Sequence, residues 1–205
     1  MKEIILRDIS KSYGEKKVLS HLSLSFAPGH LTCLQGPSGA GKTTLLRLIA
    51  GLEKPDAGTL EGIPERIAFV FQEDRLCEDF SAPANVQLVT QKRLSRDRIL
   101  AHLREIGLPE DSLRQPVREF SGGMKRRTAL VRAVCYDADL VILDEPFKGL
   151  DEALKSKVID YVLRYTAGKT VLVVTHEKEE ATRLGGRLIT LEPFLPHDSG
   201  DEPAV

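Results

Sequence analysis

Short apolar runs separated by turns recur along the chain and predict buried β-strands. A strand covered by helices on both faces has apolar side chains at nearly every position, as in parallel sheets. Residues 140–143, Leu-Val-Ile-Leu, fit this pattern and suit the middle of such a sheet. The other predicted core strands are residues 31–35, 67–71, 170–174 and 187–191. The pattern therefore predicts an α/β fold with a mostly parallel core sheet.

Two further kinds of periodicity surround these runs. Leu154, Val158 and Val162 recur every four residues and predict a helix with one apolar face. Near the N-terminus, residues 4–6 and 22–26 predict strands, and the second alternates between apolar and polar positions. Additional elements are predicted as helices over residues 44–50 and 177–184 and as a strand beginning at residues 59–60.

The segment from Gln72 to Tyr136 differs from the rest of the chain. It is charged and lacks strong strand signals, and Ile99, Leu103 and Ile106 recur with helical spacing. We expect a single domain over residues 1–191, with a helical subdomain over about residues 73–136 inserted in its core. Residues 192–205 contain three prolines and four acidic residues and are predicted to be a disordered tail.

Composition restricts the classes of function. The 205 residues suffice for one domain, and 41% hydrophobic residues can form a sizeable core. The net charge of −1 gives no bulk attraction to nucleic acid, which is not an expected partner. No apolar stretch approaches the roughly 20 residues of a membrane span, and the N-terminus has no visible secretory signal. Three scattered cysteines suit a reducing cytosol without disulfides.

A phosphate-binding loop follows the first core strand. Residues 36–43 match the pattern G-x-x-x-x-G-K-[ST], set between a predicted strand and a predicted helix. Glycines let backbone N–H groups approach an anion, Lys42 supplies a positive charge and the Thr43 hydroxyl can bind Mg²⁺. The candidate nucleotide-binding residues here are Gly36, Pro37, Ser38, Gly39, Ala40, Gly41, Lys42, Thr43 and Thr44.

Two further polar groups have a functional and a simpler interpretation. Asp144 and Glu145 end a core strand, where ligands of parallel sheets bind, and could organise Mg²⁺ and accept a proton from water. They could also be ordinary solvated charges. The run Ser121-Gly122-Gly123 precedes basic residues and could bind a second anion, or could simply cap a helix that begins near Met124.

Three single residues carry weaker signals. His176 follows a core strand and could contact a phosphate or its attacking water, although a lone histidine is often structural. Gln72 also ends a core strand, and its amide could bind a metal or water, or be solvent-exposed. Tyr13 precedes Gly14 and could stack on a base, or pack on an edge strand.

Together these elements resemble the ATP-binding-cassette (ABC) ATPases over about residues 2–191. Residues 36–43 correspond to the family's Walker A loop, Gln72 to its Q-loop and residues 121–123 to its signature. Asp144 and Glu145 correspond to the Walker B acids. Residues 149–151 correspond to the D-loop, His176 to the switch histidine and Tyr13 to the adenine-stacking aromatic. The resemblance implies a P-loop NTPase fold with an N-terminal antiparallel β part.

The resemblance also implies a mechanism. Two chains, a homodimer or a pair of close paralogues, would meet head to tail with ATP between Walker A of one and Ser121, Gly122 and Gly123 of the other. Thr43, Gln72 and Asp144 would bind Mg²⁺. Glu145 would polarise the attacking water, while His176 and Lys42 stabilise charge on the γ-phosphoryl group, which is chiefly an electrostatic task.

The implied setting is the cytoplasmic face of a membrane, where the chain would bind transmembrane permease subunits, with a solute-binding protein in the same complex. Several motifs look most like nitrate, sulfonate and taurine importers. The alternatives are an exporter subunit, a soluble ABC ATPase or a regulatory module that binds ATP without hydrolysing it. Phe120, Met124 and Lys148 depart from the usual family residues. No Asn-Lys-x-Asp guanine motif occurs, so we do not expect a GTPase.

Overall fold

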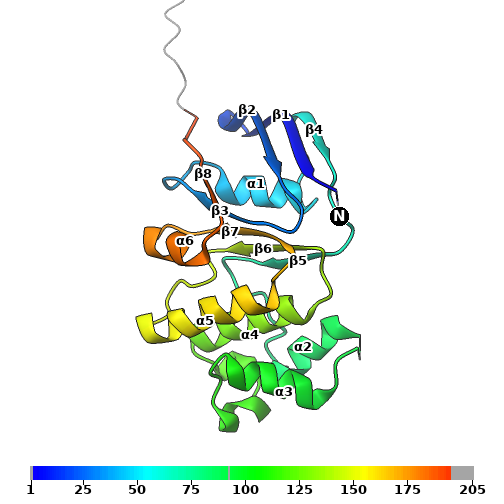
Figure 1. Cartoon of the computed structure of the whole chain (residues 1–205), viewed down its shortest axis with the longest axis vertical. Helices are drawn as coiled ribbons and strands as arrows, with labels where there is room; N and C mark the ends of the chain where they lie inside the picture. The colour runs from blue at the N-terminus through cyan, green and yellow to red at the C-terminus, as the bar shows by residue number, and fades with distance from the viewer. Residues whose placement is uncertain (1, 92, 195–205) are drawn as a thin grey trace, which may run out of the picture.

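Five parallel strands form the centre of the molecule, in the order β5-β6-β7-β3-β8 (Figure 1). The computed structural model describes residues 2–91 and 93–194. The strands are β3 (Leu31–Gln35), β5 (Ile67–Val70), β6 (Leu140–Asp144), β7 (Thr170–Val174) and β8 (Arg187–Thr190). The predicted parallel core sheet is confirmed. β3, which precedes the phosphate loop, and β6, which carries the acidic pair, are separated by β7.

Side chains at successive positions of these strands point to opposite faces of the sheet and contribute to two hydrophobic cores. One contains Leu34, Ile142, Leu172 and Val174, packed with apolar residues of α1 (Lys42–Ile49). The other contains Cys33, Val141, Leu143 and Val173, packed with residues of α4 (Gly122–Cys135) and α5 (Glu152–Tyr165). Adjacent positions on a strand point to opposite faces, so a continuous apolar run is required where both faces are covered. Figure 1 shows α1 above the sheet and α4 and α5 below it.

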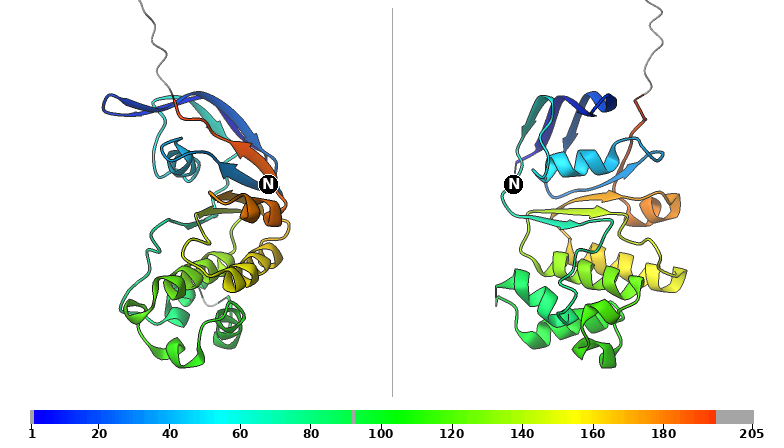
Figure 2. Two further views of the ribbon diagram at one scale, coloured as in Figure 1. Left: turned by 90° about the vertical axis from the view of Figure 1, so that its left-hand side faces the viewer. Right: turned by 180° about the vertical axis from the view of Figure 1, so that it is seen from behind.

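A second, antiparallel sheet lies on the outer side of α1, in the order β2-β1-β4 (Figure 2). Its strands are β1 (Ile4–Tyr13), β2 (Lys16–Phe26) and β4 (Ala57–Glu61). β1 is longer than the strand predicted over residues 4–6, because a bulge interrupts the apolar alternation on which that prediction was based. At the bulge, Asp8 has φ 55° and donates its N–H to Ser23 Oγ at 3.0 Å. Since β1 is the central strand, the interpretation that Tyr13 packs on an edge strand is wrong.

The helices between β5 and β6 are α2 (Ala82–Thr90), α3 (Arg96–Glu105), the 3₁₀ turns η1 (Glu110–Arg114) and η2 (Val117–Glu119), and α4. Ile99, Leu103 and Ile106, whose spacing predicted a helix, are at most 1% exposed. α2 and α3 lie farthest from the antiparallel sheet in Figures 1 and 2. The same core joins this helical layer to the parallel sheet, because α4 packs against both.

The last helix, α6 (Lys178–Leu184), precedes β8. Of the predicted disordered tail, residues 195–205 lie outside the described residues. Within residues 2–91 and 93–194, no helix has the length and apolarity needed to cross a membrane.

We predict that Leu172→Ala lowers the free energy of unfolding by about 2–5 kcal/mol, the usual range for a leucine truncated in a packed core. Leu172 is fully buried in the middle strand of the parallel sheet. The matched control is Leu188→Ala on β8, whose leucine is 53% exposed, and we expect a change within about 0.5 kcal/mol. Urea unfolding measures both, and equal losses would contradict the described packing.

Candidate functional site: a phosphate loop and an acidic strand end

The loop of residues 36–41 joins β3 to α1 in a shape that requires glycine at both ends. Gly36 has φ 144°, and a Cβ there would lie 2.2 Å from the carbonyl oxygen of Leu191. Gly41 caps α1 with φ 84°, in the left-handed region that side chains disfavour. α1 therefore begins at Lys42, two residues earlier than predicted, and its N-terminus points at the loop. Such a terminus favours anions.

Lys42 lies across this loop. It is 6% exposed, and its Nζ donates to the carbonyl oxygens of Gly36 at 2.7 Å and Pro37 at 2.8 Å. Burial lowers the pKa of Lys42, and the negative charges of Glu145 and Asp144 partly oppose this shift. The loop thus contains a cation held by weak, neutral acceptors, which a phosphate oxygen can replace.

Thr43 connects the loop to β6. Its hydroxyl donates to Oδ2 of Asp144 at 3.0 Å, and Asp144 is 2% exposed. Burial raises the pKa of Asp144, an effect that the Thr43 hydrogen bond reduces and the charge of Glu145 reinforces. A hydroxyl and a carboxylate at this distance are hard oxygen donors, which suit Mg²⁺. The two predicted ligands are therefore adjacent and chemically appropriate.

Glu145 brings the other predicted residues together. Its Oε1 lies 2.9 Å from Nε2 of His176, and its Oε2 lies 3.4 Å from Nε2 of Gln72 and 2.9 Å from Nζ of Lys148. A carboxylate can only accept, so Nε2 of His176 carries the proton in this contact. Glu145 itself has φ 50°, a strained value for a side-chain-bearing residue. Its N–H donates to the Val174 carbonyl oxygen at 3.0 Å.

The ionised form of Glu145 is favoured. Burial alone would raise its pKa, but Lys148 and His176 together outweigh burial and place the pKa below its ordinary value. Glu145 is thus ionised at neutral pH, while neighbouring Asp144 is shifted in the opposite direction. Such a divergence between adjacent carboxyl groups is typical of sites with separate acid–base and metal-binding roles.

Glu145 and its partners line a cavity of about 500 Å³ at the carboxyl edge of the parallel sheet. Its lining includes Ser38, Gln72, Glu145, Lys148, Thr175 and His176. The structure therefore brings together the phosphate loop, the strand-end glutamine, the acidic pair and the histidine.

Other predicted residues do not line this cavity: Lys42, Thr43 and Asp144 adjoin it through the loop and the end of β6, while residues 121–123 and Tyr13 lie apart from these contacts. Ser121 caps α4 by accepting the Met124 N–H at 3.3 Å, and α4 begins at Gly122. A Cβ added to Gly123 would contact Leu150, so this turn adjoins the segment after Glu145. Tyr13 is 45% exposed, and its hydroxyl donates to Glu53.

Comparison with known proteins assigns the family. A family model described as "ABC transporter" matches residues 19–148 of the chain. The chain belongs to the ABC transporter family. This membership confirms the predicted ABC-ATPase fold, the ATPase activity, and ATP with Mg²⁺ as the nucleotide and ion. The individual roles of the site residues stay predictions.

Relatives within the family include importers and exporters. The chain is 41% identical to the aliphatic sulfonates import ATP-binding protein SsuB of Granulibacter bethesdensis, covering 92% of this chain and 79% of that protein. It is 37% identical to the Nod factor export ATP-binding protein I of Rhizobium etli, covering 98% and 71%. The dimeric structure of MJ0796, a bacterial ABC transporter cassette, superposes with a TM-score of 0.82 at 30% identity, covering 92% and 94%.

Sequence reasoning missed the contacts that hold Gln72 in this ABC ATPase. Arg126 on α4 donates to the carbonyl oxygens of Phe71, at 2.6 Å, and Gln72, and pairs with Asp74 at 3.1 Å. The helix capped by Ser121 therefore holds the backbone of the strand-end glutamine. The signal that the sequence offers is the pair Arg126 and Arg127, both of which occupy buried positions of α4.

A second missed group supports His176. Lys155 on α5 is 7% exposed, and its Nζ contacts Glu177 at 2.5 Å, Glu152 at 3.1 Å and Glu180 at 3.2 Å. Glu180 also accepts from the hydroxyl of Thr175. Lys155 therefore contacts Glu177, the residue after His176, directly, and Thr175, the residue before it, through Glu180. A lysine three residues before Val158, within the apolar stripe, is the sequence signal for a buried cation.

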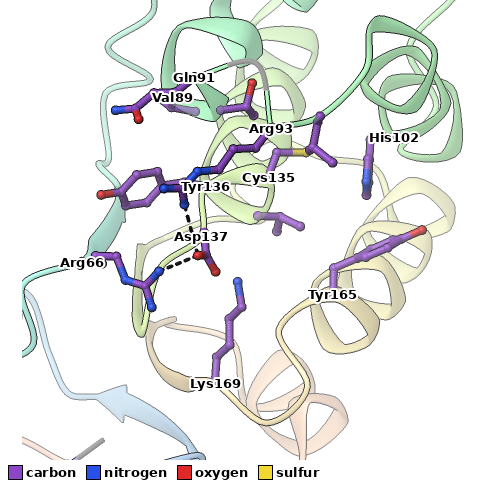
Figure 3. Close-up of a pocket in the computed structure, with 13 residues that line it drawn as sticks. Arg66, Val89, Gln91, Arg93, His102, Cys135, Tyr136, Asp137, Tyr165 and Lys169 are labelled. Atoms are coloured by element: carbon purple, nitrogen blue, oxygen red, sulfur yellow. Dashed lines mark hydrogen bonds and ion pairs between the residues drawn. The ribbon is translucent and has the colours of Figure 1, made fainter.

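A separate cavity of about 540 Å³ lies at the opposite edge of the sheet (Figure 3). Arg66, Asp137 and Lys169, which line it, precede β5, β6 and β7 respectively. Asp137 pairs with Arg66 at 2.5 Å and Arg93 at 3.4 Å. None of the predicted site residues lines this cavity, so it is distinct from the ATPase site.

We predict that Lys155→Met destabilises the protein by about 2 kcal/mol at neutral pH, because it leaves the buried carboxylate of Glu180 without its cation. Burial already raises the pKa of Glu180. Ionised Glu180 therefore opposes folding, and that cost disappears as the carboxyl group takes up a proton. The deficit should shrink as the pH is lowered from neutral, measured by urea unfolding.

Lys157→Met is the matched control, since Lys157 is an exposed lysine on the same helix. It should leave stability nearly unchanged. A pH-independent deficit in Lys155→Met would contradict the assigned role of Glu180.

Proposed function

We propose that the chain is the ATP-hydrolysing subunit of a bacterial importer and works as a head-to-tail dimer. The observation that carries the catalytic part is the Glu145 carboxylate, 2.9 Å from Nε2 of His176, in a cavity that Ser38 of the phosphate loop also lines. A base, a proton-bearing imidazole and a buried lysine beside a phosphate cradle are the groups that phosphoryl transfer to water requires.

Each residue has a distinct task in this proposal. Backbone N–H groups of residues 36–43 and Lys42 bind the phosphates of ATP. Glu145 accepts a hydrogen bond from the attacking water and takes its proton, and His176, whose Nε2–H donates to Glu145 in this structure, stabilises charge on the γ-phosphoryl group. Thr43, Asp144 and Gln72 hold Mg²⁺. When bound, this ion neutralises charge on the phosphate oxygens.

The dimer explains why the chain has a second anion-binding turn. Ser121 and the N–H groups at the start of α4 do not line the cavity that contains Glu145. We infer that residues 121–123 close the phosphate site of a second subunit. The dimeric form of the similar cassette MJ0796 supports this inference. ATP then holds the two subunits together, and its hydrolysis releases them.

Import is supported by relatives named as aliphatic sulfonates import ATP-binding proteins, at 40–41% identity. We propose that the chain binds transmembrane permease subunits at the cytoplasmic face of the membrane, through the helical insertion over about residues 73–136. A solute-binding protein would deliver a small organic anion to the permease.

Export is the second candidate, because Nod factor export ATP-binding proteins match at 37–40% identity. The genes beside this one distinguish the two. A permease together with a solute-binding protein supports import, and a permease without one supports export.

We predict that Glu145→Gln lowers kcat for ATP hydrolysis by about 10²–10⁴-fold, the usual contribution of a general base, while ATP affinity and ATP-dependent dimerisation persist. Phosphate release and size-exclusion chromatography with ATP measure the two effects. Glu179→Gln, at an exposed glutamate of α6, is the control and should retain activity. Turnover by Glu145→Gln at the wild-type rate would refute the role of Glu145.

A further inference from the structure

Lys148 occupies one oxygen of Glu145, and the function proposed above gives it no task. Its Nζ lies 2.9 Å from Oε2, and its side chain is 62% exposed against 15% for that of Glu145. Lys148 lines the same cavity as Ser38 and His176. The ammonium group is therefore within the candidate site, not on a remote surface.

Both carboxylate oxygens of Glu145 are engaged in this arrangement. Oε1 faces His176 at 2.9 Å, and Oε2 accepts from Lys148 at 2.9 Å with Gln72 at 3.4 Å. A carboxylate has about four acceptor sites, so Lys148 and Gln72 fill Oε2, while Oε1 keeps one site beside His176. A general base accepts a hydrogen bond from the water that it deprotonates, and Lys148 leaves it fewer sites for that water. A glutamate is ionised at neutral pH without assistance. The main effect of the lysine is therefore to occupy the oxygen.

We propose that Lys148 is an inhibitory positioning residue: its ion pair with Glu145 occupies Oε2 and slows ATP hydrolysis until a partner subunit has closed fully on the site and the contact is released. The inference rests on the proposed role of Glu145 as the base. It concerns the step at which two subunits close on ATP, before which hydrolysis would be unproductive.

The contact is suited to release. An ion pair with one largely exposed partner is weak and is screened by salt. Lys148 is followed by Gly149, at φ 77°, where an added Cβ would meet nothing within 4 Å. Leu150 in turn adjoins Gly123 in the first turn of α4. Docking of a second subunit at residues 121–123 would therefore reach the segment that carries Lys148, and a phosphate oxygen could compete for its ammonium group.

The test is the basal ATPase activity of the purified full chain carrying Lys148→Met. We expect kcat to rise about two- to fivefold, the range expected from an exposed ion pair, with KM for ATP unchanged. The ratio of variant to wild-type kcat should fall toward one as salt concentration rises, because screening weakens the ion pair in the wild type. Lys148→Arg preserves the charge and should keep the wild-type rate.

Lys157→Met, at an exposed lysine of α5, controls for the change in net charge and should not alter kcat. Unchanged or lower kcat in Lys148→Met would overturn the proposal, as would equal increases in Lys157→Met or Lys148→Arg. Glu145→Gln distinguishes a failure of the inhibitory contact from a failure of the role of Glu145. If it is inactive while Lys148→Met behaves as wild type, only the inhibitory contact fails. If it is active, the role of Glu145 fails first.

Discussion

The parallel pairing of β3, β7 and β6 is the constraint on which the site depends. In register, Leu34 pairs with Val174, which also pairs with Asp144, so these strands end at one edge. The phosphate loop follows β3, the acidic pair lies at the end of β6, and His176 comes shortly after β7. The Thr43–Asp144 hydrogen bond at 3.0 Å joins two of these segments. Apolar alternation into two cores fixes this register, because a one-residue slip would exchange the two faces.

At this edge of the sheet, a buried cation and a buried carboxyl group are positioned to bind a phosphate and a metal ion. Lys42 is buried and donates to two carbonyl oxygens, and Asp144 is buried against a hydroxyl. Phosphate and Mg²⁺ would satisfy both groups better than the protein does alone. The remaining donors, at Ser121 and the start of α4, line no part of the cavity around Glu145. This separation supports the proposal that these donors close the site of a second subunit.

The sequence was sufficient for the parts of the site that local rules govern. Gly36, Lys42, Asp144 and His176 were predictable because a loop pattern or a strand end places them. The contacts of Arg126 with Phe71 and Asp74, and of Lys155 with Glu177 and Glu180, were not, since each depends on tertiary packing between segments that no local pattern relates. The bulge at Asp8 likewise concealed most of β1. Predictions therefore succeeded where backbone geometry determines position and failed where long side chains connect elements.

The most direct test of the shared site is cross-linking between two differently marked chains. Ser38→Cys and Ser121→Cys would be made in separate Glu145→Gln chains lacking the exposed Cys77, mixed, and treated with a short thiol cross-linker. Our account predicts a cross-linked dimer of one chain of each kind that forms with ATP and Mg²⁺ and not without nucleotide. Failure to cross-link while ATP is bound, or cross-linking within a single chain that carries both cysteines, would contradict it.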